Sequence, residues 1–247
     1  MWHYIILGIL QGIFEWIPVS SEGIVALSSQ FFPVGTSPVN TAIFLHFGTL
    51  FASVLYFRKD WIEIVTFKNP VMLRFLIIST VFSLATGYPL YTMIEGQATG
   101  AVLLLIMGGG LLFTAFFNRT KKYKLKMDET SKVLPVIAGL LQGLAVIPGL
   151  SRSGATVFGL SVGQLTPPQI LKISYIMSAP VVLASSVYLL LTDPVLTEGW
   201  PALVSSFIVG ILSLALIMKY VSRINFFYFA LIFSILCIIS GIIVFFI

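Results

Sequence analysis

Two stretches of this sequence place charged and hydroxyl side chains inside otherwise apolar surroundings. The stretch 8–23 carries Glu15 and Glu22, and the stretch 139–156 carries Arg152. A carboxylate takes up protons from neighbouring hydroxyls, and an arginine holds phosphate or carboxylate groups with its fork of donors. These residue types therefore indicate chemistry on a bound anion.

The same phrase opens both stretches. The pattern Gly-x-x-Gln-Gly begins at Gly8 and again at Gly139, 131 residues later, and a proline and serines follow each copy. Backbone that leaves the helix at membrane depth is tolerated only where it is buried in protein or lines a polar cavity. Two such breaks in corresponding places of two halves indicate a binding site at the interface of a repeat.

The second stretch has the features of an anion cradle. Gly149 and Gly154 permit close approach of a ligand to the backbone, and a helix that resumes near Ala155 would direct free N–H groups and its positive dipole end to that ligand. Arg152 adds donors suited to phosphate. Carboxylate would fit as well, so the pattern indicates an anion, with phosphate favoured. Further hydroxyl donors come from Ser151, Ser153 and Thr156.

The first stretch supplies a candidate base and nucleophile. Ser20 and Ser21 follow Pro18, and Glu15 lies one to two helical turns before them. A serine hydroxyl needs a base to become a nucleophile, and Glu15 is placed to act as one. The alternative is a purely structural salt bridge between the acids of this stretch and the arginine of the other.

The rest of the chain indicates a multi-pass membrane protein. The 247 residues are 58% hydrophobic and only 9% charged, whereas a soluble domain carries about a quarter charged residues. Apolar runs approach or exceed the length of about 20 residues that crosses a bilayer. We expect an all-α integral membrane protein with six transmembrane helices, at 40–57, 71–93, 99–117, 169–192, 200–218 and 224–247.

Charge between these spans predicts their orientation. The connectors 58–74 and 118–132 are basic on balance, and Lys219 and Arg223 lie between the last two spans, whereas 94–98 and 193–199 contain acids but no Lys or Arg. Basic connectors lie in the cytoplasm, so this distribution accounts for the net charge of +5 without nucleic acid. With an N-terminus outside, the segment 2–33 begins and ends outside, and 133–165 begins and ends inside.

The interrupted segments 2–33 and 133–165 are then expected to be re-entrant helical hairpins that enter from opposite faces, although two short crossings in place of each hairpin remain an alternative. We expect a single membrane domain, 1–247, with inverted-topology repeats at about 1–93 and 133–223. The span 99–117 and the cytoplasmic loop 118–132 would join the two repeats.

Two further residues have an open interpretation. His46, in the expected span 40–57, either moves protons or binds phosphate, or is an ordinary hydrogen-bonded packing histidine. Cys237 is the single cysteine of the chain, so an intrachain disulfide is excluded, and the metal, if there is one, stays unknown from the residues alone.

The two motifs resemble those of the undecaprenyl-diphosphate phosphatases of the bacitracin-resistance type. The matching segments are QGIFEWIPVSS at 11–21 and PGLSRSGAT at 148–156, and the resemblance extends over the whole chain. It implies an integral-membrane hydrolase that removes the terminal phosphate of a C55-type polyprenyl diphosphate and releases the monophosphate carrier for envelope glycan synthesis. It further implies a site that opens to the outside of the plasma membrane and support by a divalent cation, Mg²⁺ or Ca²⁺.

The resemblance also assigns roles. Glu15 matches the second glutamate of the family's first motif and Ser21 its nucleophile. Two positions depart from the family pattern: Gln11 stands where a glutamate is usual, and Ile24 where a histidine is usual. Glu22 is an additional carboxylate that restores the count of acids. We therefore expect Glu15, Ser21 and Glu22 to be catalytic, with phosphate bound by Ser20, Ser151, Arg152, Ser153 and Thr156.

The departures leave a second hypothesis open, a transporter or flippase for a polyprenyl phosphate or a small anion, which would use the same site at mid-membrane. The expected partners are the polyprenyl diphosphate and membrane lipid, with a homodimer as an open alternative and no nucleic acid.

Overall fold

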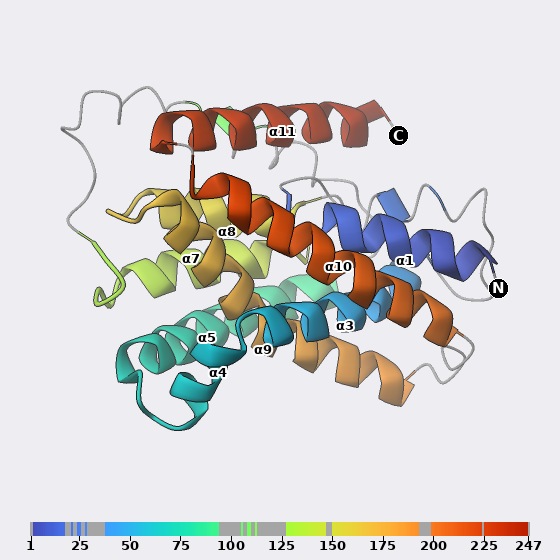
Figure 1. Ribbon diagram of the computed structural model, residues 1–247, viewed down its shortest axis with the longest axis horizontal. Helices are drawn as coiled ribbons and strands as arrows, with labels where there is room; N and C mark the ends of the chain where they lie inside the picture. Colours follow the sequence, from blue (N-terminus) through green and yellow to red (C-terminus); the bar gives the residue numbers. More distant parts are fainter. Residues whose placement is uncertain are drawn as a thin grey trace.

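The computed structural model describes residues 2–17, 21, 24–25, 28, 38–93, 105, 108–109, 112, 127–146, 150–192, 199–223 and 225–246, and in these ranges it consists of helices and short connections, without a strand (Figure 1). The helices are α1 (Trp2–Phe14), α3 (Pro38–Tyr56), α4 (Arg58–Val65), α5 (Pro70–Met93), α7 (Leu134–Leu144), α8 (Arg152–Ser161), α9 (Pro167–Thr192), α10 (Trp200–Val221) and α11 (Phe226–Phe246).

The expected membrane class is confirmed. Four helices of the described part, α5, α9, α10 and α11, are long and apolar enough to cross a bilayer, and α3 joins them if it is taken together with α4. These helices coincide with five of the six expected spans. The sixth, 99–117, falls mostly on residues outside the described ranges, although Gly108 accepts a hydrogen bond of 2.8 Å from the hydroxyl of Ser234 on α11.

The basic connector 58–74 contains a short helix that the sequence reading did not predict. Helix α4 turns away from α3 by 82° after Phe57. It exposes Ile62 and Val65 beside charged residues, and Lys172 at the start of α9 binds Asp60 at 2.5 Å. An amphipathic helix that leaves a span at this angle suits the membrane interface.

The repeated phrase packs its glycines against the long helices. A Cβ atom added at Gly12 of α1 would lie 2.7 Å from the backbone nitrogen of Gly210 on α10. A Cβ atom added at Gly143 of α7 would lie 2.6 Å from the carbonyl oxygen of Ser83 on α5. Small residues let membrane helices approach closely, so α1 packs along α10 and α7 along α5.

Both of these helix pairs run parallel. Along α1 and α10, Gly8 lies against Ala202 and Gly12 against Gly210. Along α7 and α5, Gly139 lies against Ser79 and Gly143 against Ser83, so the residue numbers rise together in both pairs. Helix α3 also runs parallel to α10, since Gly48 meets Leu203 whereas Gly210 meets Ala52. Because only α4 and a short turn join the end of α3 to the start of α5, α5 runs opposite to α3 and therefore opposite to α10.

The second interrupted segment is a helix, a break and a helix, as expected. Helices α7 and α8 have 11 and 10 residues, or about 15 Å each, which is half of the hydrocarbon core. They pack against one another, and Gly159 lies close to Leu141. Of the first segment, α1 and its final turn to Ile17 are described, and most of 18–37 lies outside the described residues.

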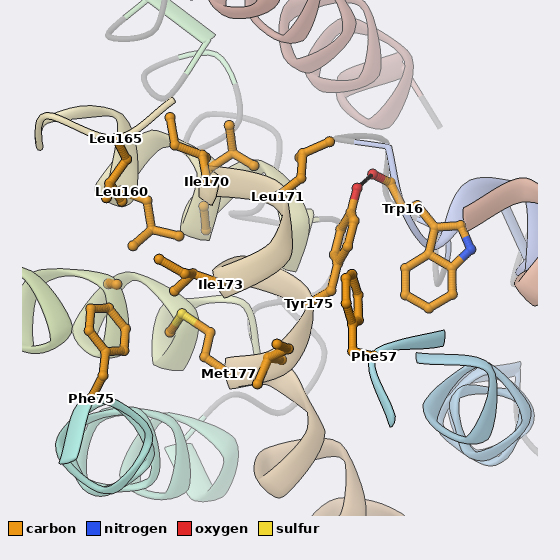
Figure 2. Close-up of a cluster of buried hydrophobic side chains, with 14 of the residues drawn as sticks. Trp16, Phe57, Phe75, Leu160, Leu165, Ile170, Leu171, Ile173, Tyr175 and Met177 are labelled. Atoms are coloured by element: carbon orange, nitrogen blue, oxygen red, sulfur yellow. Dashed lines mark hydrogen bonds between the residues drawn. The ribbon is translucent and has the colours of Figure 1, made fainter. Parts of the chain in front are cut away.

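The largest buried cluster surrounds the first half of α9. Phe75 of α5, Leu160 of α8 and the α9 residues Ile173 and Met177 pack together, and Tyr175 extends from the same helix toward Trp16 (Figure 2). In lipid, such packing stabilises the bundle through close contact rather than through removal of water. Helix α9 thus carries apolar contacts on one side and reaches the end of α1 on the other.

Candidate active site

Glu15 is the centre of the site. It lies in the turn that follows α1, and its side chain is only 3% exposed. Its Oε2 atom accepts a hydrogen bond of 2.7 Å from the Gln11 amide and one of 3.2 Å from the Ser21 hydroxyl. The Nε2 atom of His46 lies 3.2 Å from the same oxygen, and the Arg152 guanidinium pairs with Oε1.

The turn that carries Glu15 is fixed by its neighbour Trp16. The indole nitrogen of Trp16 donates to the Gly210 carbonyl at 2.9 Å and to the Ser213 hydroxyl at 3.1 Å. Its backbone carbonyl accepts a bond of 2.5 Å from the Tyr175 hydroxyl (Figure 2). Helices α9 and α10 therefore hold the chain where α1 ends, and they set the position of the carboxylate.

The second break presents Arg152 to this carboxylate. Ser151 has extended backbone angles and caps α8, since its hydroxyl accepts a bond of 3.2 Å from the Gly154 nitrogen. Arg152 is the first residue of α8. Ser153 donates at 2.7 Å to the carbonyl of Ile17 and so ties the second break to the first.

The remaining expected phosphate ligands contact protein groups in this structure. Ser151 and Ser153 share a bond of 3.0 Å between their hydroxyls. The Thr156 hydroxyl donates to the carbonyl of Arg152 at 3.0 Å and lies 2.5 Å from the hydroxyl of Ser174. These three side chains brace the first turn of α8, and their binding of phosphate stays a prediction. Ser20 and Glu22 lie outside the described residues.

A small pocket adjoins the carboxylate. Its polar lining includes Glu15, His46, Thr49, Ser53, Arg152 and Ser178, and its apolar lining Trp16, Leu50 and Val182. Ser53 is buried, and its hydroxyl has no hydrogen-bond partner within the described part of the chain. A pocket lined by charged groups and hydroxyls, with a few apolar side chains among them, suits the phosphate end of an amphiphile.

Some of these groups are not marked by the sequence. It leaves the role of His46 open and does not indicate Thr49, Ser53 or Ser178 as site residues. The available signal was weak: His46 is a titratable residue in an expected span, and Thr49 and Ser53 follow it at helical spacing on the same face. Nothing in the sequence singled out Ser178.

The two departures from the family pattern have different consequences in the structure. Gln11 is buried, and its amide holds Glu15, whereas its own Oε1 atom has no partner among the described groups. A glutamate there would place a second carboxylate 2.7 Å from the first. Ile24 is half-buried and brings no titratable group, so the imidazole of this site comes from His46 on α3.

The described residues do not form a cation cage. No group of three His, Cys, Asp or Glu residues in that part of the chain is arranged to hold a metal ion. Glu15 already carries the Arg152 guanidinium on one oxygen and several donors on the other. A divalent cation prefers several oxygen ligands, so these residues alone do not fit one.

Buried charge beside serine hydroxyls in a bundle of long apolar helices defines a class of protein: an integral membrane protein with ionised groups paired inside its bundle. The chain belongs to the family of the bacitracin resistance protein BacA, whose family model matches residues 4–243.

Curated relatives support this assignment over nearly the full length. The chain is 33% identical to the undecaprenyl-diphosphatase of Haloarcula marismortui, over 97% of both chains. It is 34% identical to that of Methanothrix thermoacetophila, over 92% of this chain and 91% of the relative. With the undecaprenyl-diphosphatase of Thermosipho africanus it shares 32% identity over 99% of both.

Proposed function

We propose that this protein is a polyprenyl diphosphate phosphatase, a membrane hydrolase that removes the terminal phosphate from an undecaprenyl-type diphosphate. The observation that carries the proposal is the convergence of the Ser21 hydroxyl and the Arg152 guanidinium on the buried carboxylate of Glu15. Nucleophile, base and anion-binding cation are thereby brought together. Relatives that match the chain over most of its length are named undecaprenyl-diphosphatases.

The first chemical step transfers the phosphoryl group to the enzyme. Ser21 Oγ attacks the terminal phosphorus, and its proton passes to Glu15 Oε2, 3.2 Å away. The Oγ–P bond forms, the bond from phosphorus to the bridging oxygen breaks, and the polyprenyl monophosphate leaves with the bonding electrons. Arg152 stabilises the charge on the transferring group, so the substrate has to draw the guanidinium from its present partner, Glu15.

The second step regenerates the serine. Water attacks the phosphorus, the Oγ–P bond breaks, and Glu15 returns its proton to Ser21. Both protons of the water stay on the released group, which leaves as dihydrogen phosphate, and Glu15 is again a carboxylate. Both steps use the same two oxygen atoms, Ser21 Oγ and Glu15 Oε2, so a single short path carries the proton in each direction.

The lipid tail would leave the pocket between α3 and α9. Leu50 of α3 and Val182 of α9 line the pocket together with the charged groups. Beyond it, Phe51 on α3 and Leu183 on α9 are exposed. An isoprenoid chain is as apolar as these side chains, so it gains contact along them without leaving lipid.

The finer architecture is also a proposal: six spans and two re-entrant hairpins in inverted repeats, about 1–93 and 133–223. The parallel packing of α1 on α10 and of α7 on α5 supports it, because α5 and α10 run in opposite directions. Helices α1 and α7 then enter from opposite ends of the bundle (Figure 1). The site contains groups from both breaks.

Basic residues support an orientation with the site open to the outside of the plasma membrane. Arg58 and Lys59 follow α3, Arg74 is near the start of α5, Lys172 near the start of α9, and Arg223 follows α10. Helix α4, the starts of α5 and α9 and the end of α10 lie toward one end of the bundle (Figure 1), which would be the cytoplasmic end. We also propose that the protein forms a homodimer, which crosslinking in membranes would test.

A divalent cation would arrive with the lipid diphosphate. Mg²⁺ and Ca²⁺ commonly bind substrate phosphate oxygens with only one or two protein carboxylates, and the described residues offer no larger set. The phosphate-binding roles of Ser20, Ser151, Ser153 and Thr156 and the catalytic role of Glu22 belong to the same proposal.

The test is release of inorganic phosphate from a polyprenyl diphosphate by the purified protein in detergent. We expect activity in the wild type and a loss of at least about a hundredfold in Ser21→Ala and Arg152→Ala, by analogy with the removal of other transition-state contacts. Ser222→Ala and Arg223→Ala, which change exposed residues after α10, are the matched controls. No release by the wild type, together with movement of the lipid across proteoliposomes, would support a transporter instead.

A further inference from the structure

His46 contacts the catalytic carboxylate with one ring nitrogen and the backbone with the other. It lies on α3 and is buried, and its Nδ1 atom is 2.6 Å from the carbonyl oxygen of Ala42 one turn earlier. Its Nε2 atom is 3.2 Å from Glu15 Oε2. Both partners are oxygen atoms, and a carbonyl oxygen can only accept a hydrogen bond.

These contacts constrain the protons of the ring. Nδ1 must carry a hydrogen to bond the Ala42 carbonyl. A neutral ring would then direct the lone pair of Nε2 at a carboxylate oxygen, which is unfavourable. The reverse arrangement, a protonated Glu15 that donates to His46, conflicts with the Gln11 amide and the Arg152 guanidinium, which both donate to that carboxylate. The arrangement is satisfied when both ring nitrogens donate, as in an imidazolium.

We propose that the His46 imidazolium is the second cation of the phosphate site and acts beside Arg152. Without substrate, one carboxylate holds both cations. With His46 charged, Glu15, Arg152 and His46 sum to a net charge of about +1, which attracts a terminal phosphate. This inference rests on the proposed function for the identity of the anion, and on geometry alone for the presence of the second cation.

The placement of the pocket supports this role. His46 and Arg152 come from different helices, α3 and α8, and both line the pocket beside Glu15. A phosphoryl group has three equatorial oxygens that need hydrogen-bond donors. Arg152 does not have to supply all of these donors if His46 supplies one. His46 is a short side chain anchored at Nδ1, so Nε2 can exchange a carboxylate oxygen for a phosphate oxygen with a small movement.

Few other groups compete to set the charge of His46. Helix α10, packed along α3, carries no acidic or basic side chain before Lys219. Helix α4 begins 12 residues after His46, about 18 Å along the helix. In the described part of the other elements around this site, the titratable or charged side chains are His3, Tyr4 and Glu15 on α1 and its final turn, Arg152 on α8, and Lys172, Tyr175 and Tyr188 on α9, and Lys172 pairs with Asp60.

The proposal predicts anion binding that weakens as pH rises, and sulfate is the probe because its charge stays constant over the range used. Sulfate binding to the purified protein in detergent would be measured by calorimetry between about pH 5.5 and 8.5. We expect the dissociation constant to rise by about tenfold in the wild type, the size of one charge-assisted hydrogen bond.

Variants test whether His46 causes the pH dependence of sulfate binding. His46→Gln should bind sulfate as weakly at low pH as the wild type does at high pH, with a change of less than about twofold across the range. His46→Lys, a cation throughout this range, should restore tight binding without the pH dependence. His3→Gln, at an exposed position of α1, should behave as the wild type does.

Two results would overturn the proposal: a dissociation constant in the wild type that is flat with pH, or a pH dependence that persists unchanged in His46→Gln. The wild-type profile decides even if the variants do not fold, because a flat profile alone contradicts a titrating cation. Phosphate release from the lipid is measured in parallel. Absence of release with pH-dependent sulfate binding would remove the proposed function and leave the second cation in place.

Discussion

The ion pair between Glu15 and Arg152 predicts an asymmetric loss of stability. Glu15→Gln leaves two cations, Arg152 and His46, facing one another at a site where the carboxylate is 3% and the guanidinium 19% exposed. Arg152→Gln leaves the carboxylate with its other donors, Gln11 and His46. Loss of one partner from a buried pair costs about 3–5 kcal/mol, so Glu15→Gln should lie in this range.

The arginine variant should lose less, about 1–3 kcal/mol, because hydrogen bonds to the remaining charge persist. In the double variant no unpaired carboxylate or guanidinium remains, so its loss should fall below the sum of the single losses by about 2 kcal/mol or more. Reversible unfolding in mixed micelles measures all three, with Arg223→Gln as the matched surface control. Additive losses, or a larger loss for Arg152→Gln than for Glu15→Gln, would refute the reasoning.

Three further predictions concern packing, positioning and the cation. Gly12→Leu should prevent α1 from packing on α10 and abolish folded protein in size-exclusion chromatography, whereas Gly109→Ala should be tolerated because no atom lies within 4 Å of the added Cβ. Tyr175→Phe removes the bond to the Trp16 carbonyl and should lower stability by about 1 kcal/mol and kcat several-fold, with KM nearly unchanged. Removal of divalent cations by a chelator should lower phosphate release, and Mg²⁺ should restore it; unaltered release would contradict a cation carried by the diphosphate.

The sequence allowed the main elements to be predicted because their causes are local. Long apolar runs specify the spans whatever their neighbours are, so α5, α9 and α10 fall within a few residues of expectation. Glycine, proline and serine in an apolar stretch specify the break before α8 in the same way. Buried charges of opposite sign require partners, and this requirement is why the contact of Glu15 with Arg152 was foreseeable.

The features that escaped prediction depend on how helices are rotated against each other. Residues of α3 alternate between lipid and protein according to its packing on α10, which Gly48 permits by close approach to Ser206. That rotation directs His46 to Glu15, and the hydropathy of α3 does not reveal it. The bend after Phe57 occurs without glycine or proline, so no local signal marked it.

The two copies of the repeated phrase also differ in a way that sequence alone did not show. Gln11 donates to the buried carboxylate of Glu15, whereas its counterpart Gln142 donates to the Ser83 hydroxyl of α5. The same residue type therefore holds a charged group in one copy and a neighbouring helix in the other. The difference arises because Glu15 follows the first copy and an apolar residue, Val146, follows the second at the same place.

The central claim is that Ser21 attacks the terminal phosphorus and carries the phosphoryl group between the two steps. The most direct measurement is to mix enzyme with polyprenyl diphosphate bearing a labelled terminal phosphate, quench within the first turnover, and locate the label by peptide mass spectrometry. We predict phosphate on Ser21 in the wild type and none in Ser21→Ala. Labelled phosphate on another side chain, or single-turnover release by Ser21→Ala at the wild-type rate, would contradict the account.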